Sequence, residues 1–189
     1  MNNATSTTFP SSTSTTAAPT TTTLLPQTTT TTGTPSIGTR PTSPAPSGTL
    51  SVTDYGAKAD GVNNDTAAIQ ACMDAAASQG KVCYLPSGTY RVYTLRPPSG
   101  LSVQGAGAGQ TIIRTLAAKG AATDAFDLVN RSNVTVQDLS LLGASTDGHM
   151  YGNDQGFYMA NSHNITIKNV WFNYWTFAMR TGSDGTTRG

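Results

Sequence analysis

Between residues 66 and 79 the apolar positions recur with the period of a helix. Four apolar residues fall at i, i+3, i+4 and i+7 and therefore share one face: Ile69, Cys72, Met73 and Ala76. Asp65 stands where an N-cap residue is expected, and Gly80 is a natural stop. The pattern predicts one amphipathic helix over 66–79, the only convincing helix in the chain.

After this helix the apolar residues occur in short runs broken by Gly, Asn and Ser, which is typical of strands. A further short strand is predicted over 51–55, ending at Gly56, with turns following it. No helical pattern separates any two of the later runs, so the sequence favours a sandwich, a barrel or a solenoid over a sheet built from βαβ units. The later predicted strands are Val82–Leu85, Tyr90–Leu95, Leu101–Gln104, Thr111–Thr115, Ala125–Val129, Asn133–Leu142, Gly156–Ala160 and Asn164–Phe172.

An internal repeat favours the solenoid. Residues 133–141 match residues 164–172 position by position, 31 residues apart, with Val134 and Val136 in the places of Ile165 and Ile167. A near-constant period of this size, with strands but no helices, is typical of stacked β-solenoid coils. We expect Asn side chains to form ladders at the bends, and we expect the helix over 66–79 to cap the open apolar end.

The first 48 residues differ in composition from the rest, because 32 of them are Thr, Ser or Pro. Such a segment cannot bury enough apolar surface to fold, so we expect 1–48 to be a disordered linker or stalk and 49–189 to be one domain. Stalks of this kind are typical of extracellular proteins. We therefore predict an extracellular, secreted or cell-surface location, although the start of the chain shows no signal peptide.

Charge and motifs exclude several classes of function. The net charge is +1 without a basic run, so we expect no nucleic-acid partner, and no apolar stretch is long enough to predict a membrane partner. There is no phosphate-binding loop and no Cys/His cluster, so we expect no cofactor and no metal. The chain has ten Asp and no Glu, so any carboxylate chemistry depends on Asp. The sequence leaves the oligomeric state open.

The two cysteines, Cys72 and Cys83, are close in sequence. In an extracellular chain they are expected to form a disulfide that closes a short loop. The alternative is a pair of buried thiols that behave as small apolar residues.

Two segments, 52–71 and 82–90, carry a longer signature. They read D-Y-G-A-K-x-D-G, then D-T-x-A-I-Q-x-A, then V-x-x-x-P-x-G-T-Y. This pattern resembles the N-terminal region of the pectate-lyase-like superfamily, which includes polygalacturonase-related hydrolases, rhamnogalacturonase/epimerase-type proteins and alginate epimerases. The resemblance implies an all-β fold, a right-handed single-stranded parallel β-helix with an N-terminal capping helix.

The resemblance implies that the chain is the N-terminal part of an extracellular protein acting on a polysaccharide or oligosaccharide, a pectin-type glycoside hydrolase or lyase. The Asp motifs of the polygalacturonase type are missing here, and in the family they lie on later coils. We therefore expect a fragment that shows no turnover by itself. One alternative is a non-catalytic glycan-binding adhesin or tail-spike-like β-helix, and another is a uronate epimerase.

One loop combines two carboxylates, an imidazole and a phenol: Asp147, His149, Tyr151 and Asp154. Alginate epimerases and some lyases use a Tyr/His/Asp set, in which His or Tyr removes the proton next to a uronate carboxylate. The order and spacing here differ from the family motif. These residues are candidates for catalysis, and the alternative is a polar loop between coils.

Three aromatic residues follow the second repeat: Trp171, Tyr174 and Trp175. By alternation with Phe172, Trp171 is expected to point outward, where an aromatic ring can stack on a sugar. We therefore predict that the three residues bind substrate. The alternative is that they cover a loop or are buried against further coils.

Overall fold

The structure, a computed structural model, describes residues 45, 47–118, 123–144 and 154–182. The chain divides into two units, residues 1–37 and 38–189, and every described residue belongs to the second unit. Nearly all of the Thr/Ser/Pro-rich segment lies outside the described residues. Its expected disorder and its boundary at residue 48 stay predictions.

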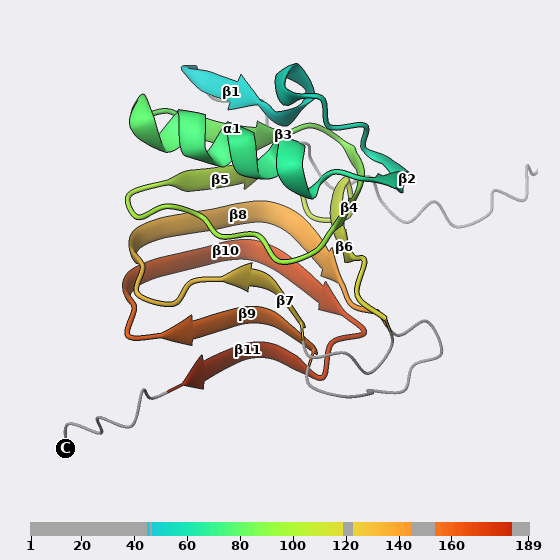
Figure 1. Ribbon diagram of the computed structural model, residues 1–189, viewed down its shortest axis with the longest axis vertical. Coiled ribbons are helices and arrows are strands. Elements are labelled where there is room, and N and C mark those ends of the chain that lie inside the picture. The colour runs from blue at the N-terminus through green and yellow to red at the C-terminus, as the bar shows by residue number, and fades with distance from the viewer. Residues whose placement is uncertain (1–44, 46, 119–122, 145–153, 183–189) are drawn as a thin grey trace, which may run out of the picture. The chain divides into compact units, whose positions relative to one another are not determined.

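The described part is a stack of parallel strands with one α-helix at its N-terminal end (Figure 1). Every pairing between the strands of the described residues is parallel. The elements are β1 (Thr49–Ser51), the 3-10 helix η1 (Val52–Tyr55), β2 (Asp60–Asn64), α1 (Thr66–Ser78), β3 (Val82–Leu85), β4 (Gly88–Val92), β5 (Ser102–Gly105), β6 (Thr111–Thr115), β7 (Thr123–Asp127), β8 (Ser132–Leu142), β9 (Asp154–Ala160), β10 (His163–Asn173) and β11 (Phe177–Gly182).

The strands form three sides of a coil. One side contains β1, β3, β5 and the first halves of β8 and β10, and a second contains β2, β4, β6 and the second halves of β8 and β10. The third side is the separate sheet of β7, β9 and β11. This arrangement is a parallel β-helix, so the predicted fold class is confirmed.

Single residues with a left-handed backbone turn the chain from one side to the next. Asp138, at φ 59°, lies between the half of β8 that pairs with β5 and the half that pairs with β6. Asn169, at φ 52°, has the same place in β10. Asn and Asp tolerate this conformation better than other residues with a side chain, because their short polar groups form local hydrogen bonds.

The same residues form ladders between successive coils, as the repeat predicts. Asn169 Nδ2 donates to Asp138 Oδ1 at 2.7 Å. Asn164 donates to Asn133 at 3.0 Å, and Asn161 donates to Asn130 at 2.7 Å. Each of these pairs is 31 residues apart in the sequence, so the repeat length is the length of one coil.

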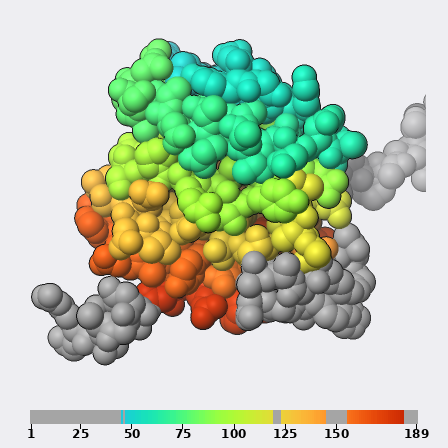
Figure 2. Space-filling model, in the orientation of Figure 1, coloured from blue at the N-terminus to red at the C-terminus, as the bar shows by residue number. Residues whose placement is uncertain are grey.

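The interior is a column of stacked apolar side chains. Val103, Val136 and Ile167 occupy equivalent positions on three successive coils, as the repeat predicts. On the third side the rings of Phe126 and Phe157 stack at a centroid distance of 5.1 Å. The consecutive coils follow one another along the stack from blue to red in Figure 2.

Helix α1 covers the N-terminal end of this column, as predicted. Its buried residues are Ile69, Cys72, Met73 and Ala76, the four residues that share one face in the sequence pattern. Figure 2 shows the helical region lying over the next coils of the stack. The helix thereby covers apolar surface that would otherwise be exposed to water.

Residues of the sequence signature hold this cap in place. The buried carboxylate of Asp65 accepts the backbone N–H groups of Lys58 at 2.7 Å and Ala59 at 3.3 Å. Asp65 occupies the N-cap position of α1, but its side chain makes no cap hydrogen bond. Asn64 Oδ1 instead accepts the Thr66 N–H at 3.0 Å. The signature is therefore explained by structure rather than by catalysis.

Two predictions near the N-terminus were wrong. The strand predicted over 51–55 is β1 at Thr49–Ser51 followed by the helix η1, which ends at Gly56 with φ 95°. Alternation suggested a strand, but only Val52 of η1 is buried. The segment predicted to form turns after Gly56 contains the strand β2, which the pattern missed because its residues are polar and mostly exposed.

Candidate functional site

Four side chains with complementary chemistry lie in register across the third side of the coil. The bridge between Leu95 and Phe126 brings Arg96 beside Asp127. Asp127 pairs with Tyr158 on β9, and Tyr158 pairs with Arg180 on β11. We call Arg96, Asp127, Tyr158 and Arg180 the polar row.

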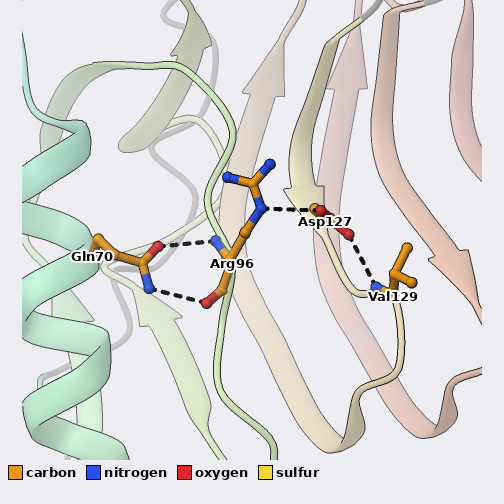
Figure 3. A network of polar contacts seen from close by, with 4 residues as sticks. All are labelled: Gln70, Arg96, Asp127 and Val129. Carbon is orange, nitrogen blue, oxygen red and sulfur yellow. Dashed lines mark hydrogen bonds and ion pairs between the residues drawn. The ribbon is translucent and has the colours of Figure 1, made fainter.

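The first half of the polar row is fixed by hydrogen bonds. Arg96 Nε donates to Asp127 Oδ2 at 3.1 Å, and Asp127 Oδ1 accepts the Val129 N–H at 3.0 Å (Figure 3). Gln70 of α1 exchanges two hydrogen bonds of 3.0 Å with the backbone of Arg96. The side chain of Arg96 is 58% exposed. In Figure 3 its two terminal nitrogens point away from the other residues drawn.

The second half combines a phenol and a cation. The guanidinium of Arg180 lies over the ring of Tyr158, 5.9 Å from its centroid, a cation–π distance. Gly182 leaves room for the phenol, because a Cβ at this position would lie 2.5 Å from the Tyr158 hydroxyl oxygen. In the backbone register Tyr158 stands between Asp127 and Arg180, and its ring lies against Arg180.

Asp124 adds a second carboxyl group beside the polar row. Burial raises the pKa of Asp124, and the negative charge of Asp127 raises it further. Arg180 and Arg96 act in the opposite direction. A carboxyl group with a raised pKa near two arginines is an arrangement suited to proton transfer on an anionic substrate.

Most of the predicted catalytic loop cannot be placed. Asp147, His149 and Tyr151 lie outside the described residues. Asp154 begins β9, where its backbone pairs with Thr123, and its side chain is not described. The catalytic role of these four residues stays a prediction.

The structure separates the three predicted sugar-binding aromatics. Trp171 and Tyr174 are 43% and 47% exposed, whereas Trp175 is only 6% exposed and belongs to the core. The six-membered ring of Trp171 lies against Gly109, where an added Cβ would be 3.3 Å from it. The predicted role in sugar contact therefore rests on Trp171 and Tyr174.

Cys72 and Cys83 are both buried and carry free thiols in the structure. Cys72 Sγ donates to the Leu50 carbonyl oxygen at 3.3 Å. A hydrogen bond with Cys72, together with burial, raises the pKa of the Cys83 thiol far above its ordinary value. The two sulfur atoms are neighbours, and the disulfide stays a prediction.

The sequence analysis missed the polar row because its members come from four separate segments. The signal was nevertheless present, since Arg96, Asp127 and Tyr158 follow one another at intervals of 31 residues. This is the interval of the Asn133/Asn164 repeat. Extending that repeat to polar residues would have aligned three members of the row.

Within the described ranges, no three His, Cys, Asp or Glu side chains gather in a way that could hold a metal ion. In the same part of the chain, no helix is both long enough and apolar enough to cross a membrane.

The fold and the polar row define a class of protein, a parallel β-helix with polar side chains along one side. Residues 49–123 match the family described as rhamnogalacturonase A/epimerase, pectate lyase-like. This match covers the first coils and agrees with the resemblance that the signature carries.

Three similar proteins carry names that refer to mannuronan, to alginate, or to plasmin and fibronectin. Mannuronan C5-epimerase AlgE1 of Azotobacter vinelandii is 39% identical over 53% of this chain and 9% of its own length. Alginate lyase 7 of the same bacterium is 32% identical over 63% of this chain and 16% of its own length. Plasmin and fibronectin-binding protein A of Streptococcus pneumoniae is 32% identical over 65% of this chain and 20% of its own length.

Among solved structures, the A-module of Azotobacter vinelandii mannuronan C-5 epimerase AlgE4 aligns with a TM-score of 0.56 and 27% identity. The alignment covers 70% of this chain and 41% of that module. The chain thus spans less than half of the solved module and a quarter or less of the curated relatives named above. These similarities support the parallel β-helix fold.

Proposed function

We propose that this chain forms the uronate-binding first coils of an extracellular β-helix protein that acts on mannuronan or a related acidic polysaccharide, as an epimerase or a lyase. The observation that carries the proposal is the polar row. It places two arginines, a carboxylate and a phenol along one side of a β-helix that resembles mannuronan epimerases.

The chemistry of a uronate explains why these groups suit it. The proton at C5 is next to the carboxylate, and its removal leaves negative charge that must be stabilised. Arginine donates two parallel hydrogen bonds to a carboxylate, and a phenol or a carboxyl group with a raised pKa can transfer the proton. Returning a proton to the opposite side of C5 gives the epimer. Breaking the bond between C4 and the glycosidic oxygen instead gives the unsaturated lyase product, and the departing oxygen takes up a proton.

Epimerisation needs a second proton-transfer group on the opposite side of the sugar. The predicted cluster of Asp147, His149 and Tyr151 leads in sequence directly into β9, the strand that bears Tyr158. This short separation supports a joint role for the loop and the polar row.

The binding part of the proposal is tested by titrating the full chain with oligomannuronate and with a neutral oligosaccharide of equal length, using calorimetry. We expect binding of the acidic ligand only. Arg180→Gln should weaken binding about tenfold, because it removes a charged hydrogen-bond donor. Lys81→Gln removes an exposed charge between α1 and β3 and is the matched control. Equal binding of both ligands, or no binding, would contradict the proposal.

Turnover is tested separately by proton NMR of oligomannuronate in D2O and by the absorbance of unsaturated products. We expect neither deuterium exchange at C5 nor product from this chain alone. If product appears and Tyr158→Phe abolishes it while binding is kept, then the catalytic centre lies in this chain and the expectation of no turnover is wrong.

A second candidate function is adhesion to a host protein. It is favoured by the similarity to the plasmin- and fibronectin-binding protein, which covers 65% of this chain. Surface plasmon resonance with immobilised fibronectin discriminates the two functions. Binding to fibronectin that excess oligomannuronate does not reduce would favour adhesion.

The pectin-type hydrolase has less support. Hydrolysis of a glycoside requires one carboxyl group as acid and a second as base or nucleophile. Of the two carboxyl groups at the polar row, Asp127 is already bonded to Arg96 and to the Val129 N–H. An assay for reducing ends released from polygalacturonate tests this function, and we expect no release.

A further inference from the structure

Two arginines stand side by side on the second side of the coil. Arg91 of β4 and Arg114 of β6 are direct partners in register. Each lies between two buried residues of its strand, so both side chains project from the outer surface of the coil. Neighbouring strands are about 4.8 Å apart. Like charges directly opposite each other on paired strands destabilise the sheet.

Neither arginine has a counter-ion among the described residues. The one ion pair recorded in this part of the chain joins Arg96 and Asp127, and the side chains of Arg91 and Arg114 make no hydrogen bond there. Arg91 Nε is buried and has no partner. A buried donor without an acceptor is unfavourable. An anion bound by the terminal nitrogens of the two guanidinium groups would relieve the repulsion between them.

The carboxylate nearest in register is engaged elsewhere. Asp60 of β2 pairs with Thr89, two residues before Arg91. Its Oδ1 accepts the backbone N–H groups of Val62 at 2.8 Å and Asn63 at 2.9 Å, and its Oδ2 accepts Asn63 Nδ2. Asp60 therefore stabilises its own loop and leaves the arginine pair positively charged.

The same outer surface carries Trp171. Ile112, two residues before Arg114 on β6, pairs with Ser140 of β8, and Ser140 pairs with Trp171 of β10. One side of the indole packs on Gly109, while 43% of the residue stays exposed. By strand spacing and rise, Arg114 and Trp171 are roughly 12 Å apart between backbones. A short acidic oligosaccharide can bridge that distance.

We propose that Arg91 and Arg114 form a carboxylate-binding subsite for an acidic polysaccharide, with Trp171 stacking on a neighbouring sugar. The subsite rests on the proposed function for the identity of its ligand, and it lies on a different side of the coil from the polar row. The planar fork of arginine matches a carboxylate, so two forks can hold one sugar acid from two directions.

The test measures binding of oligomannuronate to the full chain by calorimetry at low salt. Arg114→Gln should weaken binding on the order of tenfold, since one charged pair of hydrogen bonds is lost. Arg114→Lys keeps the charge without the fork and should weaken binding by a smaller factor. Lys81→Gln, the control with one exposed charge removed, should leave affinity within about twofold.

Stability provides a second readout that does not need the ligand. Relief of the repulsion predicts that Arg114→Gln raises the melting temperature of the free protein at low salt, and that the rise shrinks at high salt. A fall in melting temperature at low salt would show that the arginine pair is structural and would overturn the proposal.

The outcomes separate the two proposals. If the wild-type chain does not bind oligomannuronate, the proposed function fails. If it binds but Arg91→Gln and Arg114→Gln bind equally well, the subsite fails while the function stands. If inorganic phosphate competes as well as oligomannuronate does, the pair is a general oxyanion site, and the assignment to uronate is overturned.

Discussion

The bends of the coil depend on single residues that adopt a left-handed backbone. Two requirements explain why Asp and Asn occupy positions 138 and 169. Each residue tolerates a positive φ, and each forms a hydrogen bond of the ladder between coils. Gly105, at the matching bend of the earlier coil, has no room for a Cβ because the Asp138 carbonyl oxygen lies against it. At these positions, both the backbone geometry and the contact between coils limit which amino acids can be accommodated.

Substitution of Asp138 separates these two effects. Asp138→Ala should lower the free energy of unfolding by about 2–3 kcal/mol, because it adds backbone strain and removes the acceptor of Asn169. Asp138→Gly removes the acceptor without the strain, and should cost about 1 kcal/mol less. Urea denaturation followed by tryptophan fluorescence measures both. Equal losses in the two variants would show that positive φ is not strained here.

Asp124 predicts a pH dependence of stability. Its pKa is raised in the folded state, chiefly by burial, so the folded protein binds this proton more tightly than the unfolded chain does. The stabilisation is fully present below the unfolded pKa of about 3.9 and is lost as the pH rises through the folded pKa. Asp124→Asn should therefore flatten the fall in melting temperature above pH 4. An unchanged pH profile would contradict this assignment.

At the scale of elements, helix α1 is attached to the coils through residues of the sequence signature. Gln70 of α1 exchanges two hydrogen bonds with the backbone of Arg96, and the Thr66 hydroxyl of α1 accepts the Tyr93 N–H at 2.9 Å. Gln70 thereby links the cap to the segment that carries the first member of the polar row. The sequence predicted the helix, the strands from β3 to β10 and the register of β10 on β8, because buried faces impose regular apolar patterns. It missed β11, whose residues are mostly exposed.

The neighbouring thiols of α1 and β3 predict a disulfide between Cys72 and Cys83. In the chain-entropy account, closing a loop of this length stabilises the fold by about 2–3 kcal/mol. Because the pKa of Cys83 is raised, its thiolate is rare, so oxidation of the folded protein should be slow. On oxidation, the intact mass of the protein should fall by the mass of two hydrogen atoms, and its melting temperature should rise. Cys83→Ala is the control that should show neither change on oxidation.

At the scale of the whole described unit, the two ends of the apolar column differ. Helix α1 covers the first end, whereas an apolar hollow of about 540 Å³ opens at the last coil. The residues that line the hollow are Met159, Ile165, Ile167, Asn169, Val170, Trp171, Phe172 and Met179. Burial, and with it stability, should therefore decrease from the cap toward β10.

Matched valine truncations test this gradient. Val134 of β8 is fully buried, whereas Val170 of β10 is only partly buried against the core. Val134→Ala should cost about 2 kcal/mol of unfolding free energy, and Val170→Ala less than about 1 kcal/mol. Hydrogen exchange should also be faster in β10 than in β8. Equal costs and equal exchange would mean that the coils unfold as one unit.

The sequence by itself determined the coil length, the capping helix and the stacked apolar interior of this protein, because each follows from local periodicity and from side chains that must be buried. Only the tertiary structure decided which polar residues meet. Arg96, Asp127, Tyr158 and Arg180 become neighbours through pairing between coils, and so do Arg91 and Arg114. Polar residues on an outer surface are not constrained by burial, so their sequence pattern is weak. Their proximity depends on strand register, which the packing of the interior sets.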